Sequence, residues 1–353
     1  MIKLLSAEIT KWLAVQHPPV PGRIPTPRAA PDMNPVRYSL AKLYLSMARS
    51  VSLRWQFPFL RPIGFWLEDL GDIRIRNRGL QVDLNVLVDN MDTGRRSRFG
   101  AGLGRLLLEE RGYTWFEHFS ELGNRIALAG LQPTKTPDVF ATGATVPPCF
   151  ADYKSSATNN LWSREVVPGY RHQVAPWLGA SVSGVSINTG FSVGTQISPT
   201  NSLALQVLCT SPGQPPGRQH VLVSSIRRGL ENWFLLASEY PFLHLPRPRL
   251  YATAVPGLGE FVFPRESVPY ILDDKRYVLG MSRSIYLQAY RTQELEDEAL
   301  APQDVLDTYE TFVEQGIGTE EQATENNRYA PVVFRDGVAL LDRDLVASEP
   351  WWP

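Results

Sequence analysis

The stretch that decides the fold runs from Thr136 to Ser156 and reads TPDVFATGATVPPCFADYKSS. It contains two apolar, strand-like runs. Asp138 lies in the first, Asp152 in the second, and Lys154 follows two positions after Asp152. Because strand side chains alternate between faces, Asp152 and Lys154 are predicted to share one face, and Asp138 joins them if the two runs pair. Two carboxylates and an ammonium group at a strand end can hold a divalent metal ion and position a water molecule.

Regular elements are predicted on both sides of this stretch. Residues 98–111 favour a helix because Phe99, Leu103 and Leu106 form an apolar stripe at helical spacing, and Gly112 is a suitable end. The other elements expected here are a strand at 113–119, a short helix at 170–178 with Pro176 in its first turn or breaking it, and strands at 190–195 and 203–209.

This order of elements, with Pro137-Asp138 on one strand and Asp152-Tyr153-Lys154 on the next, resembles the core of the PD-(D/E)XK nuclease superfamily. The resemblance covers roughly residues 95–210. It implies an α/β (α+β) fold with a restriction-endonuclease-like core, in which helices flank a mixed central sheet. It also implies that Asp138 and Asp152 bind Mg²⁺ (or Mn²⁺), and that Lys154 orients the nucleophile or stabilises charge at the phosphate.

Two further positions are compared with that family. Many members carry a glutamine on the helix after the motif, and Gln173 lies at that position here. It either contacts the nucleophile or the DNA backbone, or is an exposed amide without a role. Many also carry a glutamate on the first helix, but the matching position here is Ala101. Glu109 and Glu110 lie near the end of that helix. Glu110 is either a displaced third acid or a glutamate whose carboxylate reaches solvent.

The composition is that of an ordinary folded protein. Apolar residues make up 43% of the 353 residues, charged residues 20%, and the net charge is −1. Because no overall positive charge is available, a nucleic-acid partner would need a local basic surface. The candidates for DNA phosphate contacts are Arg95, Arg96 and Arg98 before the first helix and Arg105 within it. The alternative is an ordinary solvated loop.

Cysteine use and hydropathy indicate the compartment. Cys149 and Cys209 lie in apolar runs, which favours buried thiols in a reducing environment. The five histidines are scattered without metal-ligand spacing, so a zinc site is not expected. No apolar run reaches the roughly 18 residues of a membrane span, and the N-terminus does not resemble a signal peptide. A cytoplasmic protein without a membrane partner is the expectation.

The chain is predicted to divide into three regions. Residues 1–90 form a helical and proline-rich extension with a hairpin, residues 91–240 form the nuclease-like core, and residues 241–353 form an α+β extension. Within the first region, residues 2–16 and 37–51 are expected to be helices.

The last region is expected to be mainly strands at first and then a helix and a hairpin. Residues 250–290 alternate as strands, and residues 304–315 favour an acidic helix. Asp336-Gly337 predicts a hairpin, because this pair supplies the positive φ angles of a type I′ turn.

Two hypotheses for function follow. The first is a metal-dependent nuclease that hydrolyses phosphodiester bonds of DNA, in defence, restriction or repair. The second is a nuclease-fold subunit that no longer cuts and serves as a nucleic-acid-binding or scaffold protein, with protein partners bound through the terminal extensions. The intact Asp…Asp-x-Lys pattern favours the first, and Ala101 in place of a glutamate favours the second. The remaining alternatives are a surface Asp–Lys pair without a role and a structural assembly protein that makes no contact with nucleic acid.

Overall fold

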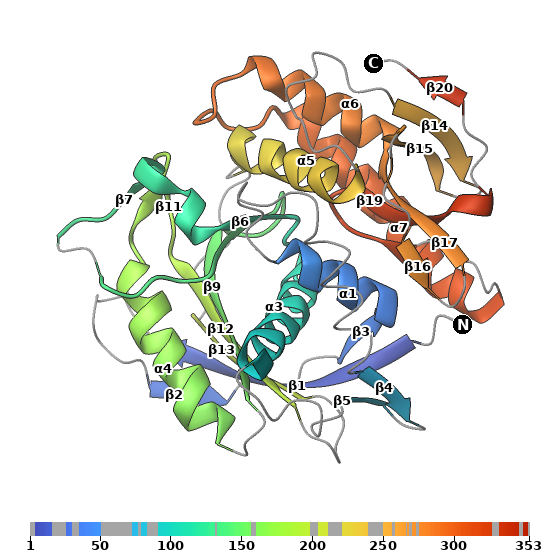
Figure 1. Cartoon of the computed structure of the whole chain (residues 1–353). Coiled ribbons are helices and arrows are strands. Elements are labelled where there is room, and N and C mark those ends of the chain that lie inside the picture. The colour runs from blue at the N-terminus through green and yellow to red at the C-terminus, as the bar shows by residue number, and fades with distance from the viewer. Residues whose placement is uncertain are drawn as a thin grey trace.

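The computed structural model of the chain is a mixed α+β structure with one large sheet built from its N-terminal part and another from its C-terminal part (Figure 1). Helices flank both sheets. The residues that the structure describes are 4–15, 26–29, 35–50, 73–76, 79–82, 91–130, 133–156, 160–197, 204–210, 221–238, 250–255, 258–265, 267, 270–272, 275–326, 332–345 and 349–351.

The first sheet has the strand order β2-β1-β13-β12-β9-β8-β6, and β3 also pairs with β1. From β6 to β9 the strands form an antiparallel meander; β12 then lies parallel to β9, and β13 antiparallel to β12. The strands are β1 (Leu4–Val15), β2 (Thr26–Ala29), β3 (Val36–Ser39), β6 (Trp115–His118), β8 (Val139–Thr142), β9 (Cys149–Ser156), β12 (Thr189–Gln196) and β13 (Ala204–Thr210).

The prediction of a helix over residues 2–16 is wrong, because this segment is the strand β1. It lies parallel to β13, with Ile9 opposite Leu205. Ala7, Ile9 and Ala14 are buried. A strand that pairs with neighbouring strands on both edges is apolar along most of its length. The spacing of apolar residues in such a run does not distinguish it from a buried helix. The first sheet therefore contains strands from both the expected N-terminal extension and the expected core.

Two helices pack against one another on one side of this sheet. The helix α1 (Leu40–Arg49) confirms the prediction for residues 37–51, and the Ser39 hydroxyl caps it by accepting from the Lys42 N–H at 3.1 Å. The helix α3 (Met91–Glu110) begins earlier than expected, but its predicted apolar stripe is buried. Gly104 lets α3 approach β9, because a Cβ there would overlap the Tyr153 ring.

The opposite side of the sheet is covered by residues 161–177, here called the cover helix. It is longer than the predicted helix at 170–178 and contains Pro168. Proline supplies no N–H for a regular helical hydrogen bond, and the chain on both sides of it adopts wide π-helical turns. The segments of the cover helix after Leu161 are η3 (Trp162–Val166), α4 (Val167–Gly169), η4 (Tyr170–Val174) and η5 (Ala175–Trp177).

Two smaller sheets accompany the first. The predicted N-terminal hairpin is present as β4 (Ile73–Arg76) paired with β5 (Gly79–Val82). A three-stranded sheet lies beyond β6, close to the turns η1 (Phe119–Glu121) and η2 (Gly123–Arg125). Its strands are β7 (Ile126–Ala127), β10 (Ser181–Val182) and β11 (Val185–Ser186).

The C-terminal sheet has the order β18-β19-β17-β15-β14-β20, and β16 pairs with β17. Its strands are β14 (Leu250–Val255), β15 (Gly259–Pro264), β16 (Tyr270–Leu272), β17 (Lys275–Ser282), β18 (Val332–Val333), β19 (Val338–Asp342) and β20 (Glu349–Trp351). The accompanying helices and turns are α5 (Val223–Ala237), α6 (Arg283–Arg291), η6 (Thr292–Glu294), α7 (Gln303–Asn326) and η7 (Arg343–Leu345).

Two expectations for this region are corrected. Strands were expected up to residue 290, but α6 begins at Arg283 and buries Ile285, Tyr286 and Ala289 at helical spacing. The hairpin between β18 and β19 is present, but its turn is not type I′, because only Gly337 has a positive φ (83°). The Gly337 N–H bonds to the Phe334 carbonyl at 3.0 Å, which closes a turn whose last residue alone is left-handed.

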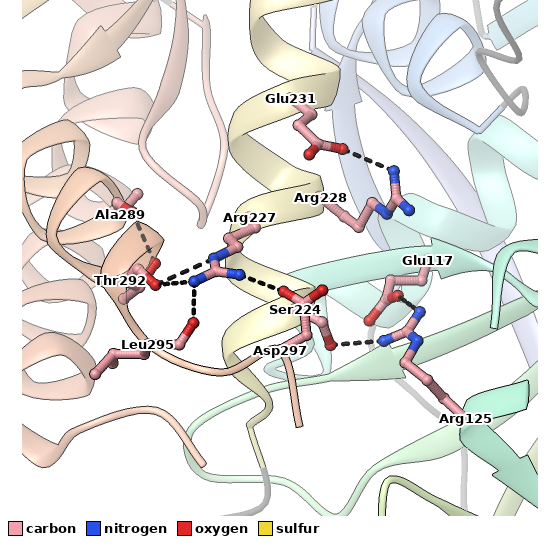
Figure 2. A network of polar contacts seen from close by, with 10 residues as sticks. All are labelled: Glu117, Arg125, Ser224, Arg227, Arg228, Glu231, Ala289, Thr292, Leu295 and Asp297. Carbon is pink, nitrogen blue, oxygen red and sulfur yellow. Dashed lines mark hydrogen bonds and ion pairs between the residues drawn. The ribbon is translucent and has the colours of Figure 1, made fainter. Parts of the chain in front are cut away.

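A polar network joins the first sheet to α5 and to the turn after α6 (Figure 2). Glu117 of β6 is buried, and its carboxylate accepts from Arg125 and from the Ser225 hydroxyl, each at 2.5 Å. Two residues further along α5, Arg227 donates to the Thr292 carbonyl. These bonds fix the C-terminal region against the sheet that carries Asp152.

The remaining general expectations concern cysteines and membranes. Cys149 and Cys209 are both buried and free, as predicted. In the part of the chain that the structure describes, no helix combines the length and apolar character needed to cross a membrane.

Candidate active site

Pairing of β8 with β9 holds Asp138 at the end of the strand pair. Val139 lies opposite Ala151 in this register. The Asp138 N–H bonds to the Ala151 carbonyl at 3.0 Å, and the Asp138 carboxylate accepts from the Tyr153 N–H at 2.8 Å. Backbone groups of β9, the strand that carries Asp152, thus hold Asp138 in place.

Asp152 and Lys154 lie on the same face of β9, as the strand period predicted. The Lys154 Nζ donates to Oδ1 of Asp152 at 2.8 Å. The Asp152 side chain is fully buried, whereas that of Lys154 is 23% exposed. This face points to the cover helix, while Tyr153 between them points to α3.

The buried Asp152 carboxylate has an unusual electrostatic environment. Burial and, secondly, the neighbouring Asp138 carboxylate raise the pKa of Asp152 to about 7, against the opposing effect of Lys154. The other oxygen, Oδ2, is buried and has no hydrogen-bond partner in the described part of the chain. A buried acceptor without a partner is costly, and such groups cluster where a cation or substrate is expected.

These features fit a divalent metal ion held by two protein carboxylates. Asp138 and Asp152 would supply the protein ligands, and the unpartnered Oδ2 is the oxygen that such an ion would satisfy. Mg²⁺ is commonly bound by one or two carboxylates and keeps several waters. No group of three or more His, Cys, Asp or Glu residues suited to a metal occurs among the described residues.

The helix α3 carries Ala101 at the position where the resemblance places a glutamate. Ala101 lines the same cavity as Asp138 and adds no carboxylate to it. Glu109 is buried and accepts from Arg105 at 3.1 Å, so it serves an internal ion pair. Glu110 is exposed, as expected for a carboxylate that reaches solvent.

The cover helix contributes a glycine and β12 a hydroxyl that the sequence analysis missed. Ser192 lies opposite Asp152 in the parallel pairing, and its Oγ is buried without a partner in the described region. A Cβ on Gly169 would overlap Oδ2 of Asp152 and would lie 2.9 Å from Oγ of Ser192. The sequence shows Ser192 as a serine within an apolar, strand-like run. Its position opposite Asp152 depends on how β12 pairs with β9, which the local sequence does not show.

Gln173 lies about one turn after Gly169 on the cover helix and is half-buried. Within the described residues its amide makes no hydrogen bond. Its predicted contact with the nucleophile or the DNA backbone stays a prediction.

The four arginines proposed for phosphate contacts have different environments. Arg98 is half-buried and lines a cavity of about 170 Å³ together with Asp138 and Arg105. Arg96 is half-buried on the same helix, and the Arg95 side chain falls outside the described side chains. Arg105 is only 4% exposed and pairs with Glu109, so it is not a surface residue that tracks a DNA backbone.

Comparison of the chain with protein-family models, with curated proteins and with solved structures found no match. Function must therefore be inferred from the residues and their geometry.

Proposed function

We propose that the chain is a metal-dependent nuclease of the PD-(D/E)XK type that hydrolyses phosphodiester bonds, with DNA as its substrate in defence, restriction or repair. The observation that carries this proposal is the buried Asp152: Lys154 bonds to one of its carboxylate oxygens, the second oxygen has no partner among the described residues, and Asp138 lies beside it. The succession α3, β6, β8, β9, cover helix and β12 supports it, because this is the order expected of a restriction-endonuclease-like core.

The roles follow from the positions of the side chains. Asp138 and Asp152 hold Mg²⁺ or Mn²⁺. When bound, such an ion acidifies a water molecule and offsets the negative charge that develops on the phosphate. Lys154 donates to Asp152 and reaches solvent with part of its side chain, so it positions the water or the phosphate. Gln173 is retained as a further contact from the cover helix.

A cleavage assay tests this proposal. Supercoiled plasmid, labelled single-stranded DNA and RNA are incubated with increasing Mg²⁺ or Mn²⁺. Asp152→Asn and Lys154→Met should lower the metal-dependent rate by about 100-fold or more while the fold is retained. Lys135→Ala is the control, because that side chain is exposed and, among the described residues, only its backbone carbonyl is hydrogen-bonded, to the Trp177 indole. Equal cutting by all variants would reject the proposal and indicate a contaminating nuclease.

The second candidate is a non-cutting nuclease-fold subunit that binds nucleic acid or organises a complex. Ala101 favours it, since this residue lines the cavity beside Asp138 without adding a carboxylate. This candidate predicts DNA binding that weakens with salt and no nicking at any metal concentration. Protein partners would bind through the terminal segments. In both cases the buried, free thiols support a reducing, cytoplasmic compartment.

A further inference from the structure

A cavity of about 170 Å³ lies on the α3 side of β9, opposite to the face that carries Asp152 and Lys154. Its wall includes Arg49 at the end of α1, Arg98 and Arg105 of α3, and Tyr153 of β9. Three arginines around one small cavity need an explanation that the proposed metal site does not supply.

Arg49 is only partly satisfied by the protein. It is 5% exposed, pairs with Asp336 and stacks its guanidinium 4.7 Å from the centre of the Phe334 ring. Its Nε and Nη1 atoms are buried and have no hydrogen-bond partner among the described residues. Leaving buried donors of a charged group unpaired is costly unless a ligand accepts from them.

Arg105 adds a second buried guanidinium next to the first. It lies 4.2 Å from the centre of the Phe116 ring and donates to the Arg49 carbonyl at 3.2 Å. Burial and then the charge of Arg49 lower the pKa of Arg105. Burial also raises the pKa of Glu109, the carboxylate that pairs with Arg105, against the opposing effects of Arg105 and Arg49. An anion between the two guanidinium groups would relieve their repulsion.

Tyr153 provides a neutral donor in the same wall. Its hydroxyl is buried without a partner in the described part of the chain, and burial raises its pKa, so it keeps its proton. Asp138 and Glu121 also line the cavity and would repel an anion, so the ligand is expected to bind against the arginines.

We propose that this cavity binds a phosphate group, held by Arg49, Arg98 and Arg105 with the Tyr153 hydroxyl as an additional donor. Guanidinium groups and a phenol match the several acceptor oxygens of a phosphate. The cavity shares Asp138 with the proposed metal site, but none of its proposed phosphate-binding groups is a metal ligand, and Asp152 and Lys154 lie on the other face of β9. Free phosphate and the terminal phosphate of a nucleic acid share this chemistry.

Calorimetric titration of the full chain with inorganic phosphate in EDTA tests the site, with thermal unfolding as a second readout. Phosphate should bind and raise the Tm of the unmodified chain, while chloride at equal ionic strength should not. Tyr153→Phe and Arg98→Gln should each weaken binding by about tenfold. Tyr153→Phe is the decisive variant and should fold normally, since it removes a hydroxyl that has no hydrogen-bond partner among the described residues. Arg171→Gln is the control, because this exposed arginine of the cover helix is not among the residues that line the cavity.

Oligonucleotides with and without a 5′-phosphate distinguish the two sources. Tighter binding of the phosphorylated strand that is lost in Tyr153→Phe assigns the cavity to strand ends, and equal binding of both strands assigns it to free phosphate. Asp152→Asn should leave phosphate binding intact even where it abolishes cleavage. Absence of a phosphate-dependent heat and Tm shift up to millimolar concentrations, or equal affinity in Tyr153→Phe, would overturn the proposal.

Discussion

Gly169 of the cover helix lies so close to Asp152 that a methyl group in its place would overlap the unpartnered carboxylate oxygen. The helix backbone therefore forms one wall of the candidate metal site, with Ser192 as its neighbour on β12. Room at this point exists only because the residue has no side chain.

Gly169→Ala should consequently displace either the carboxylate or the helix. We expect it to weaken metal-dependent cleavage and to cost about 1–3 kcal/mol of unfolding free energy, although alanine favours helices. Denaturant unfolding and a Mg²⁺ titration measure both effects. Gly229→Ala in α5 is the matched control, because its Cβ would meet only Trp115 at an ordinary 3.4 Å. Equal behaviour of the two variants would contradict the close approach at Gly169.

The raised pKa of Asp152, about 7, predicts a pH-dependent stability. An unfolded aspartate titrates near about 3.9, so between these values the folded state binds more protons than the unfolded chain. The carboxyl group therefore destabilises the fold progressively as pH rises through this window, by about 1.4 kcal/mol per pKa unit, and the penalty is complete above about pH 7. Asp152→Asn removes this penalty. In EDTA, the increase in Tm of this variant over the unmodified chain should therefore be larger at pH 8 than at pH 5. A gain that is the same at both pH values would show that Asp152 titrates normally.

Ala101→Glu tests whether the missing third acid limits metal binding. The new side chain would extend into the cavity that Asp138 lines. A third carboxylate should tighten Mn²⁺ binding by about tenfold, since affinity for hard cations rises with ligand charge. Electron paramagnetic resonance of free Mn²⁺ measures the affinity, and Ala101→Gln controls for side-chain size. Unchanged affinity in the glutamate variant would place the metal away from α3.

Glu117→Ala should strongly destabilise the contact between the first sheet and α5 that Figure 2 shows. Its carboxylate is fully buried between Arg125 and Ser225, so removal leaves a partly buried charge uncompensated at about 3–5 kcal/mol. Glu231→Ala is the control, because its pair with Arg228 lies at the surface and should contribute less than about 1 kcal/mol. Urea unfolding of both variants measures the difference. A cost below about 1 kcal/mol for Glu117→Ala would mean that this network does not hold the two parts together.

Local patterns predicted most elements of the first sheet and its helices. The apolar stripe of α3, the strand period of β9 and the Ser39-capped α1 depend on side chains a few residues apart, which the sequence displays directly. Residues 2–16 and 283–290 were misassigned, because a short apolar run suits either a buried strand or a helix until its neighbours are known. For residues 2–16 the deciding neighbour is β13, nearly 200 residues away.

The shared face of Asp152 and Lys154 was determined by the sequence itself, because strand side chains two residues apart must point the same way. Only the tertiary structure decided that Asp152 is fully buried, that one of its oxygens has no partner in the described part of the chain and that Gly169 lies against it. The cavity lined by Arg49, Arg105 and Tyr153 could not be predicted from the sequence either, because these residues come from separate elements. Burial and charge coupling arise from contacts between distant segments, and no local period encodes which segments will meet.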